Sequence, residues 1–163
     1  MGKQLYLAGG LFNAGERLHL LYLEKHLIAL GFEVILPQRE ALRFTQGEKF
    51  DRHGVAQECK RFCEDGDNIF VGCIDGTDAD SGTSVEYGVA MTATGKAVVY
   101  RTDFRTVEDT ECGRNAMFRL DDKRGGTQFV YHPCFFTKLD EVDEYYRSLA
   151  EMICKAVDTV CPP

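Results

Sequence analysis

The sequence contains no tryptophan, only four prolines and no run of basic residues. Acidic side chains outnumber basic ones by 26 to 19, which gives a formal net charge of −7 at pH 7. A chain of this charge without a basic patch is poorly suited to bind a phosphate backbone, so we expect no nucleic-acid polymer as a partner. The apolar segments are short and interrupted by charge, and we expect no membrane partner.

Signals for export and for disulfide pairing are also lacking. Residues 1–4 lead directly into a short apolar segment, without the long hydrophobic region and cleavage site of a signal peptide. The seven cysteines are an odd number, and several lie in apolar segments, as buried free thiols do. These features predict a reducing compartment, most simply the cytoplasm.

What the sequence does contain is a regular alternation of short apolar and longer amphipathic segments. Its 163 residues suit a single domain spanning 1–163. Strands that are separated by helices pair in parallel through crossover connections. The pattern therefore predicts one doubly wound α/β domain, a five-stranded parallel sheet with helices on both faces. The expected strands are residues 4–8, 33–36, 68–74, 97–100 and 127–131, and the expected helices are residues 16–30, 55–64, 83–94 and 139–157.

Three loops follow expected strands at their carboxyl ends, where doubly wound folds bind ligands. They are residues 9–15, 37–50 and 75–82. The first reads GGLFNAG, which lacks both the spacing of a dinucleotide-binding loop and the Lys and Ser/Thr of a P-loop. Its glycines either supply turn dihedrals or let a ligand approach the backbone closely.

One partial metal pattern is present, formed by Cys59 and Cys63 with His53 nearby. A zinc site needs a second pair of ligands, and the sequence offers none at suitable spacing. We expect the two thiols to share a buried helix face, and we expect no metal and no other cofactor. The four histidines lie in no recognisable catalytic pattern.

The third loop and the helix after it concentrate carboxylates: Asp75, Asp78 and Asp80 precede the helix and Glu86 lies within it. One interpretation is a capping box, in which Thr83 is the N-cap and Glu86 bonds back to its backbone. The other interpretation is catalytic. A glutamate in the first helical turn is held as an anion by the helix dipole, and such a carboxylate is a competent nucleophile toward a sugar carbon.

Two separated motifs resemble the nucleoside 2-deoxyribosyltransferase family: LYLAGGLF at residues 5–12 and DSGTSVEYG at residues 80–88. The resemblance implies a flavodoxin-like fold. It also implies transfer of 2-deoxyribose from a 2′-deoxynucleoside donor to a free nucleobase acceptor. On this resemblance Glu86 is the nucleophile, Asp80 faces the base and protonates it on departure, and Tyr6 orients Glu86.

The resemblance also suggests substrate contacts. Phe12 falls where an aromatic ring contacts the base, and we expect Gly9 and Gly82 to keep the backbone open beside the substrate. A further aspartate that many relatives carry has no clear match here, because its place falls near residues 58–59. Asp75 is the candidate to replace it in substrate binding.

Family members lend an Asn-x-Met segment to a neighbouring subunit's site, and Asn115 and Met117 match that pattern. The resemblance therefore implies a homo-oligomer in which these two residues bind the 5′-hydroxyl across an interface. Shielding of the site by a second subunit would keep water from the reaction intermediate.

The implied reaction is a retaining double displacement through a covalent deoxyribosyl–Glu86 intermediate, as in nucleotide salvage. One alternative is a 2′-deoxynucleoside 5′-monophosphate N-hydrolase of the same superfamily, although those relatives carry a hydroxyl residue where Asp80 stands. Another alternative, of a different class, is a non-enzymatic nucleotide-binding or signalling domain on a flavodoxin-like scaffold.

Overall fold

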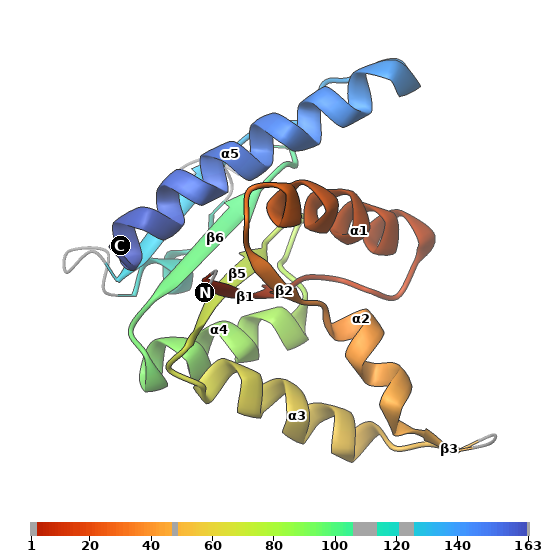
Figure 1. Cartoon of the computed structure of the whole chain (residues 1–163), viewed down its shortest axis with the longest axis vertical. Helices are drawn as coiled ribbons and strands as arrows, with labels where there is room; N and C mark the ends of the chain where they lie inside the picture. Colours follow the sequence, from red (N-terminus) through yellow and green to blue (C-terminus); the bar gives the residue numbers. More distant parts are fainter. Residues whose placement is uncertain (1–2, 47–48, 106–113, 121–125, 163) are drawn as a thin grey trace.

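A five-stranded parallel sheet forms the centre of the molecule (Figure 1). The structure, a computed structural model, describes residues 3–46, 49–105, 114–120 and 126–162. The order β2-β1-β5-β6-β7 is that of a flavodoxin-like doubly wound sheet, which confirms the predicted fold class. The strands are β1 (Gln4–Ala8), β2 (Glu33–Ile35), β5 (Asn68–Cys73), β6 (Ala97–Arg101) and β7 (Thr127–Tyr131).

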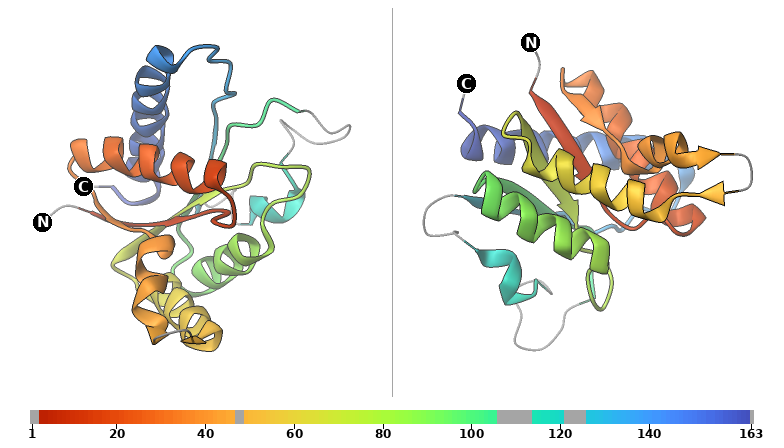
Figure 2. Two further views of the ribbon diagram at one scale, coloured as in Figure 1. Left: turned by 90° about the vertical axis from the view of Figure 1, so that its right-hand side faces the viewer. Right: turned by 90° about the horizontal axis from the view of Figure 1, so that it is seen from below.

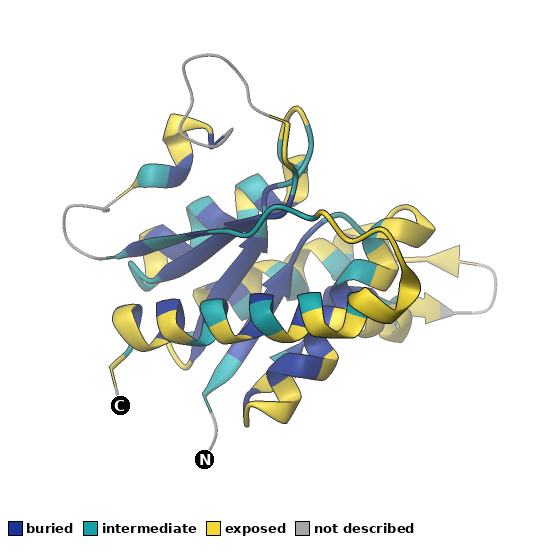
Figure 3. Ribbon diagram, turned by 90° about the horizontal axis from the view of Figure 1, so that it is seen from above, coloured by how far each residue is buried: buried dark blue, intermediate teal, exposed yellow. Residues whose placement is uncertain are grey.

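Helices cover both faces of the sheet (Figures 1 and 2). On one face lie α1 (Ala14–Ala29) and α5 (Val142–Val160), and on the other lie α3 (Arg52–Glu64) and α4 (Ser81–Ala93). In Figure 3 the central strands of the sheet are mostly buried, whereas α5 carries an exposed stripe along its outer side. None of the helices in the described part of the chain is long and apolar enough to cross a membrane.

Side chains along β1 point alternately to the two faces of the sheet, so they contribute to a separate hydrophobic core on each face. Leu5 and Leu7 belong to the core under α1 and α5, whereas Tyr6 and Ala8 belong to the core under α3 and α4. All four side chains are almost completely buried. This alternation places Tyr6 on the side of the sheet where α4 begins.

The segment expected to be a polar loop at residues 37–50 is instead built from short elements. These are α2 (Pro37–Glu40), the 3₁₀ helix η1 (Ala41–Phe44) and a hairpin of β3 (Thr45–Gln46) and β4 (Lys49–Phe50). Figure 2 shows the hairpin projecting beyond the start of α3. Two further 3₁₀ helices complete the described elements, η3 (Ala116–Arg119) and η5 (Leu139–Glu141).

Three helices begin two or three residues earlier than their apolar pattern predicts. A polar residue caps each of these helices, because its side chain accepts a hydrogen bond from a backbone N–H in the first turn. The capping residues are Asn13 for α1, Asp51 for α3 and Asp80 for α4. The C-terminal prediction for α1 is confirmed, because Gly31 follows the helix with φ of 91°, a conformation that favours glycine.

Candidate active site

Tyr6 and Glu86 meet at the carboxyl edge of the sheet. The Tyr6 hydroxyl donates to Glu86 Oε1 at 2.8 Å. The Tyr6 ring is 1% exposed and packs against Phe62 and Phe70, with ring centroids 6.0 and 6.4 Å away. Because the ring is fixed in the core, its hydroxyl holds one carboxylate oxygen of Glu86 in place.

Asp80, rather than Thr83, is the N-cap of α4. Asp80 Oδ2 accepts from the Thr83 backbone N–H at 2.8 Å and from its hydroxyl at 3.1 Å. The capping-box interpretation of Thr83 and Glu86 is therefore wrong, because Thr83 already lies inside the first turn. A Cβ added at Gly82 would lie 3.0 Å from Asp80 Oδ2, so a small residue beside the cap leaves room for that carboxylate.

The early start of α4 makes Glu86 the sixth residue of the helix, beyond the first turn. Burial raises the pKa of Glu86 to about 7, and the charge of Asp80 adds to the rise. The Tyr6 hydroxyl and the Cys59 thiol act in the opposite direction, because hydrogen bonds to the anion lower the pKa. The expectation of a glutamate in the first helical turn, held as an anion by the helix dipole, is therefore wrong, because Glu86 lies beyond that turn and burial raises its pKa.

A cavity of about 410 Å³ opens above Glu86, within the size range of small-ligand sites. Most of its lining is apolar, and the lining residues come from both predicted motifs and from the segment between them. The lining residues are Gly9, Leu11, Phe12, Pro37, Ala41, Phe50, Arg52, Val55, Ala56, Cys59, Asp80, Gly82, Thr83 and Glu86. The structure thus brings the predicted residues Gly9, Phe12, Asp80, Gly82 and Glu86 around one cavity, with Tyr6 bonded to Glu86.

The loop that presents Phe12 is held by the first turn of α1. The backbone N–H groups of Phe12 and Asn13 donate to Glu16 Oε2, at 2.8 and 3.3 Å. A Cβ at Gly10 would lie only 2.7 Å from Glu16 Cδ, and one at Gly9 would lie 3.2 Å from atoms of the core. Neither glycine has a positive φ, so close packing, rather than a turn dihedral, accounts for them.

Cys59 lines the cavity, although the sequence analysis did not place it in the site. It comes from α3 and lines the cavity together with Glu86. The neighbouring Glu58 is instead paired with Arg61 at 2.8 and 2.6 Å. Burial raises the pKa of the Cys59 thiol, so this side chain is a protonated donor near neutral pH. Cys59 and Cys63 pack in one core cluster, which confirms that they share a helix face.

The remaining predicted residues lie outside this cavity. Asp75 is not part of its lining; its carboxylate accepts from the backbone N–H groups of Thr102 and Asp103, at 2.6 and 2.9 Å. Asn115 and Met117 lie exposed on η3, where Asn115 Oδ1 accepts from the Met117 N–H at 2.9 Å. The buried ring of Phe118 anchors η3 against α4, 5.0 Å from the ring centroid of Tyr87.

Solved structures share this fold. A conserved protein from Enterococcus faecalis V583 superposes with a TM-score of 0.60 and 20% identity, over 95% of this chain and 99% of that chain. A 2-deoxyribosyltransferase from the psychrotolerant bacterium Bacillus psychrosaccharolyticus superposes with a TM-score of 0.57 and 22% identity, over 90% of this chain and 95% of that chain. At these identities the likeness shows the fold alone.

Comparison of the sequence with models of protein families identifies the family of this chain. No curated protein sequence matches the chain significantly. A family model described as nucleoside 2-deoxyribosyltransferase matches residues 5–117, which include both motifs and every residue brought around the cavity. The match covers well over half of the sequence, and the chain therefore belongs to the nucleoside 2-deoxyribosyltransferase family.

Proposed function

We propose that this protein transfers 2-deoxyribose between nucleobases, with Glu86 as the nucleophile. The observation that carries the proposal is the hydrogen bond from Tyr6 to Glu86 beneath a cavity of nucleoside size. The bond orients one carboxylate oxygen and leaves the other for attack. A carboxylate with a pKa of about 7 is ionised in a useful fraction at neutral pH and retains high basicity as a nucleophile.

In the first step, a Glu86 oxygen forms a bond to C1′ of the donor while the N-glycosidic bond breaks. The bonding electrons leave with the base, which takes a proton from Asp80 directly or through one water. Asp80 lines the same cavity as Glu86, at the N-terminus of the same helix. In the second step, a nitrogen of the acceptor base attacks C1′ from the face the first base left, and the bond between C1′ and Glu86 breaks to release the carboxylate. The acceptor base gives up its N–H proton to Asp80, directly or through one water, and the original configuration is restored.

Phe12 and the apolar lining suit the flat faces of a base. The Phe12 ring is 79% exposed at the cavity, so it is available for stacking on a ligand. Other large apolar side chains are exposed on η1, β4, α4 and η3, and such side chains favour a protein partner. They are Leu42, Phe50, Val85 and Met117. We propose that a second copy of this chain covers them and brings Asn115 and Met117 to the site.

The decisive experiment is base exchange. Incubation of the protein with 2′-deoxyinosine and adenine should yield 2′-deoxyadenosine and hypoxanthine in equal amounts, resolved by liquid chromatography. Mass spectrometry of protein quenched with donor alone should find a deoxyribosyl adduct on the peptide that contains Glu86. Absence of exchange over a panel of purine and pyrimidine pairs would refute the transferase assignment.

A second candidate, hydrolysis of 2′-deoxynucleoside 5′-monophosphates, is favoured by one observation. Arg52 lines the cavity from the start of α3, and a guanidinium there is suited to hold a phosphate. The carboxylate of Asp80 at the same cavity opposes it by repulsion. Comparison of 2′-deoxyinosine with its 5′-monophosphate as donor, in the presence and absence of adenine, separates the two activities.

A further inference from the structure

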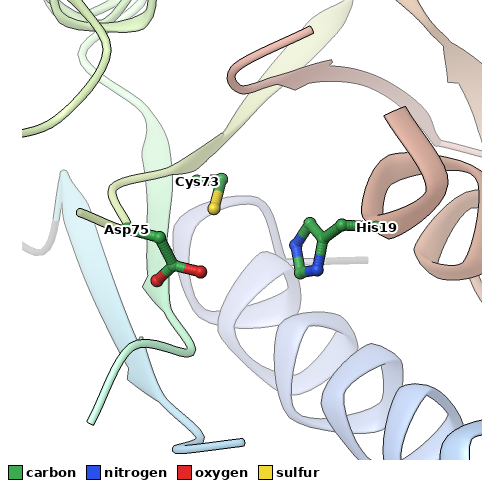
Figure 4. A group of neighbouring side chains, drawn as sticks. All are labelled: His19, Cys73 and Asp75. Carbon is green, nitrogen blue, oxygen red and sulfur yellow. The ribbon is translucent and has the colours of Figure 1, made fainter. Parts of the chain in front are cut away.

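A second cavity, of about 600 Å³, lies on the α1 and α5 side of the sheet, and Asp75 lines it. Its wall brings together His19 from α1, Cys73 from the end of β5 and Asp75 from the loop that follows (Figure 4). One ligand atom from each of these side chains lies within 4.8 Å of the other two. The proposed transfer reaction uses none of the three.

The donor set indicates the kind of ligand. A thiolate sulfur, an imidazole nitrogen and a carboxylate oxygen together suit a borderline-soft ion such as Zn²⁺, whereas Mg²⁺ and Ca²⁺ prefer oxygen ligands alone. Tetrahedral zinc bonds of 2.0–2.3 Å place ligand atoms about 3.3–3.8 Å apart. The observed spacing therefore needs side-chain shifts of only about 1 Å to close around an ion.

Hydrogen bonds already orient two of the three ligands. The Asp75 carboxylate accepts from the backbone of Thr102 and Asp103 and from the Thr102 hydroxyl. The two ring nitrogens of His19 lie 2.8 Å from the Tyr146 hydroxyl and 2.9 Å from the Tyr100 hydroxyl. Metal binding through one ring nitrogen would replace one of these two hydrogen bonds and leave the other nitrogen bonded to a tyrosine hydroxyl. A hydrogen bond on the second nitrogen orients the ring of a metal-binding histidine.

The charge state of the group is compatible with binding. Burial lowers the pKa of His19, so its ring is neutral and has a lone pair to offer. Burial and the nearby Asp75 carboxylate raise the pKa of the Cys73 thiol, so metal binding must release the thiol proton to solvent. A divalent ion compensates for the resulting thiolate beside the carboxylate.

We propose that His19, Cys73 and Asp75 form a zinc site whose fourth position opens to the second cavity. Three protein ligands with an accessible fourth position are the arrangement of zinc sites that bind water or a small ligand. The proposal revises the expectation of no metal, because it rests on two separated parts of the chain, residue 19 and residues 73–75, whereas that expectation concerned Cys59, Cys63 and His53.

Cobalt substitution tests the site without reference to activity. The full-length protein, first treated with a chelator, is titrated with Co²⁺ and then with Zn²⁺. We expect visible bands of four-coordinate cobalt with a near-ultraviolet thiolate charge-transfer band, and stoichiometric loss of both on zinc addition. Cys73→Ser should lose the charge-transfer band, and His19→Gln should weaken cobalt binding by about tenfold or more.

Cys154→Ser, on α5, is the matched control and should bind cobalt as the unmodified protein does. If Cys73→Ser does not fold, a second measurement applies: Zn²⁺ should raise the melting temperature of the unmodified protein but not that of His19→Gln. Absence of a thiolate band in the unmodified protein would overturn the proposal. A band that survives in Cys73→Ser and disappears in Cys59→Ser would overturn it as well.

Discussion

The hydroxyl of Tyr6, from strand β1, donates to Glu86 Oε1 at 2.8 Å across the sheet–helix interface. The same interface buries Glu86 and raises its pKa to about 7. Orientation and activation of the carboxylate therefore have one structural origin, the packing of α4 and α3 over β1. Substitutions that disturb this packing should change the pH dependence of the reaction, as well as its rate.

Glu86→Gln should separate function from stability. Loss of the nucleophile should lower the transfer rate by about 10³-fold or more. The folded-state pKa of Glu86 exceeds the unfolded value, so its ionisation destabilises the fold progressively as pH rises from about 4.5 to about 7. The glutamine variant should therefore be more stable by about 1–3 kcal/mol near pH 8, and this gain should shrink toward pH 5. Urea unfolding at both pH values measures the difference; a gain that does not depend on pH would contradict it.

Tyr6→Phe should move the acidic limb of the pH profile. In the unmodified protein, kcat/KM should fall as pH drops below about 7, where Glu86 takes up a proton. Removal of the phenolic donor destabilises the anion, so the limb should shift to higher pH. The rate at pH 7 should fall about 10- to 100-fold, the worth of a hydrogen bond to a charged group. Tyr131→Phe on β7 serves as the control and should leave the profile unchanged.

Cys59 should act as a positioning residue for Glu86. The thiol lowers the pKa of Glu86, so Cys59→Ala should shift the acidic limb upward and lower the rate at neutral pH by roughly two- to fivefold. Cys59→Ser retains a hydrogen-bond donor and should restore the profile. Cys154→Ala controls for loss of a thiol elsewhere. An unchanged pH profile in Cys59→Ala would limit Cys59 to a packing role.

Phe12→Ala should weaken substrate binding more than turnover. Base–aromatic stacking is worth about 1–3 kcal/mol, which predicts a rise in KM of about 5- to 100-fold. The catalytic carboxylate keeps its contacts, so kcat should change much less. Phe104→Ala removes another exposed ring, stacked 5.4 Å from Phe135, and should leave KM unaltered. Steady-state kinetics with a fixed donor and variable acceptor makes the comparison.

Subunit mixing should reveal whether sites are shared. Asn115→Ala and Glu86→Gln should each be nearly inactive alone if Asn115 serves a neighbouring site. After co-refolding, mixed oligomers contain sites with both native residues, and a dimer should regain roughly a quarter of its active sites. Sedimentation velocity establishes the oligomer size beforehand. If Asn115→Ala alone keeps full activity, its side chain serves only to cap η3.

The sequence predicted the strands well because each is a short apolar run between polar segments. Helix starts were less accurate, since the capping residues Asn13, Asp51 and Asp80 are polar and do not continue the apolar period. The elements at residues 37–50 are only two to four residues long, too short to show any period. The local sequence pattern therefore predicted the strands of the sheet. It did not predict α2 and η1, which contribute Pro37 and Ala41 to the lining of the cavity.

The motifs placed Glu86, Asp80 and Tyr6 at one edge of the sheet, because strand ends and the next helix start share that edge. They did not predict the pKa of Glu86, which depends on burial under α3, some thirty residues earlier in the chain (Arg52–Glu64). The group of His19 and Cys73 was likewise not foreseen. Its members come from distant segments and form no motif along the sequence.

The N-cap at Asp80 has a consequence for how the family can diversify. Aspartate and serine are about equally good N-caps, so exchange of one for the other costs little helix stability. Position 80 also lines the cavity, so the same exchange would put a hydroxyl group in place of a carboxylate beside the substrate. The fold thus has a position at which the chemical group facing the substrate can change at little cost in helix stability, since either side chain can accept the two hydrogen bonds that Thr83 donates.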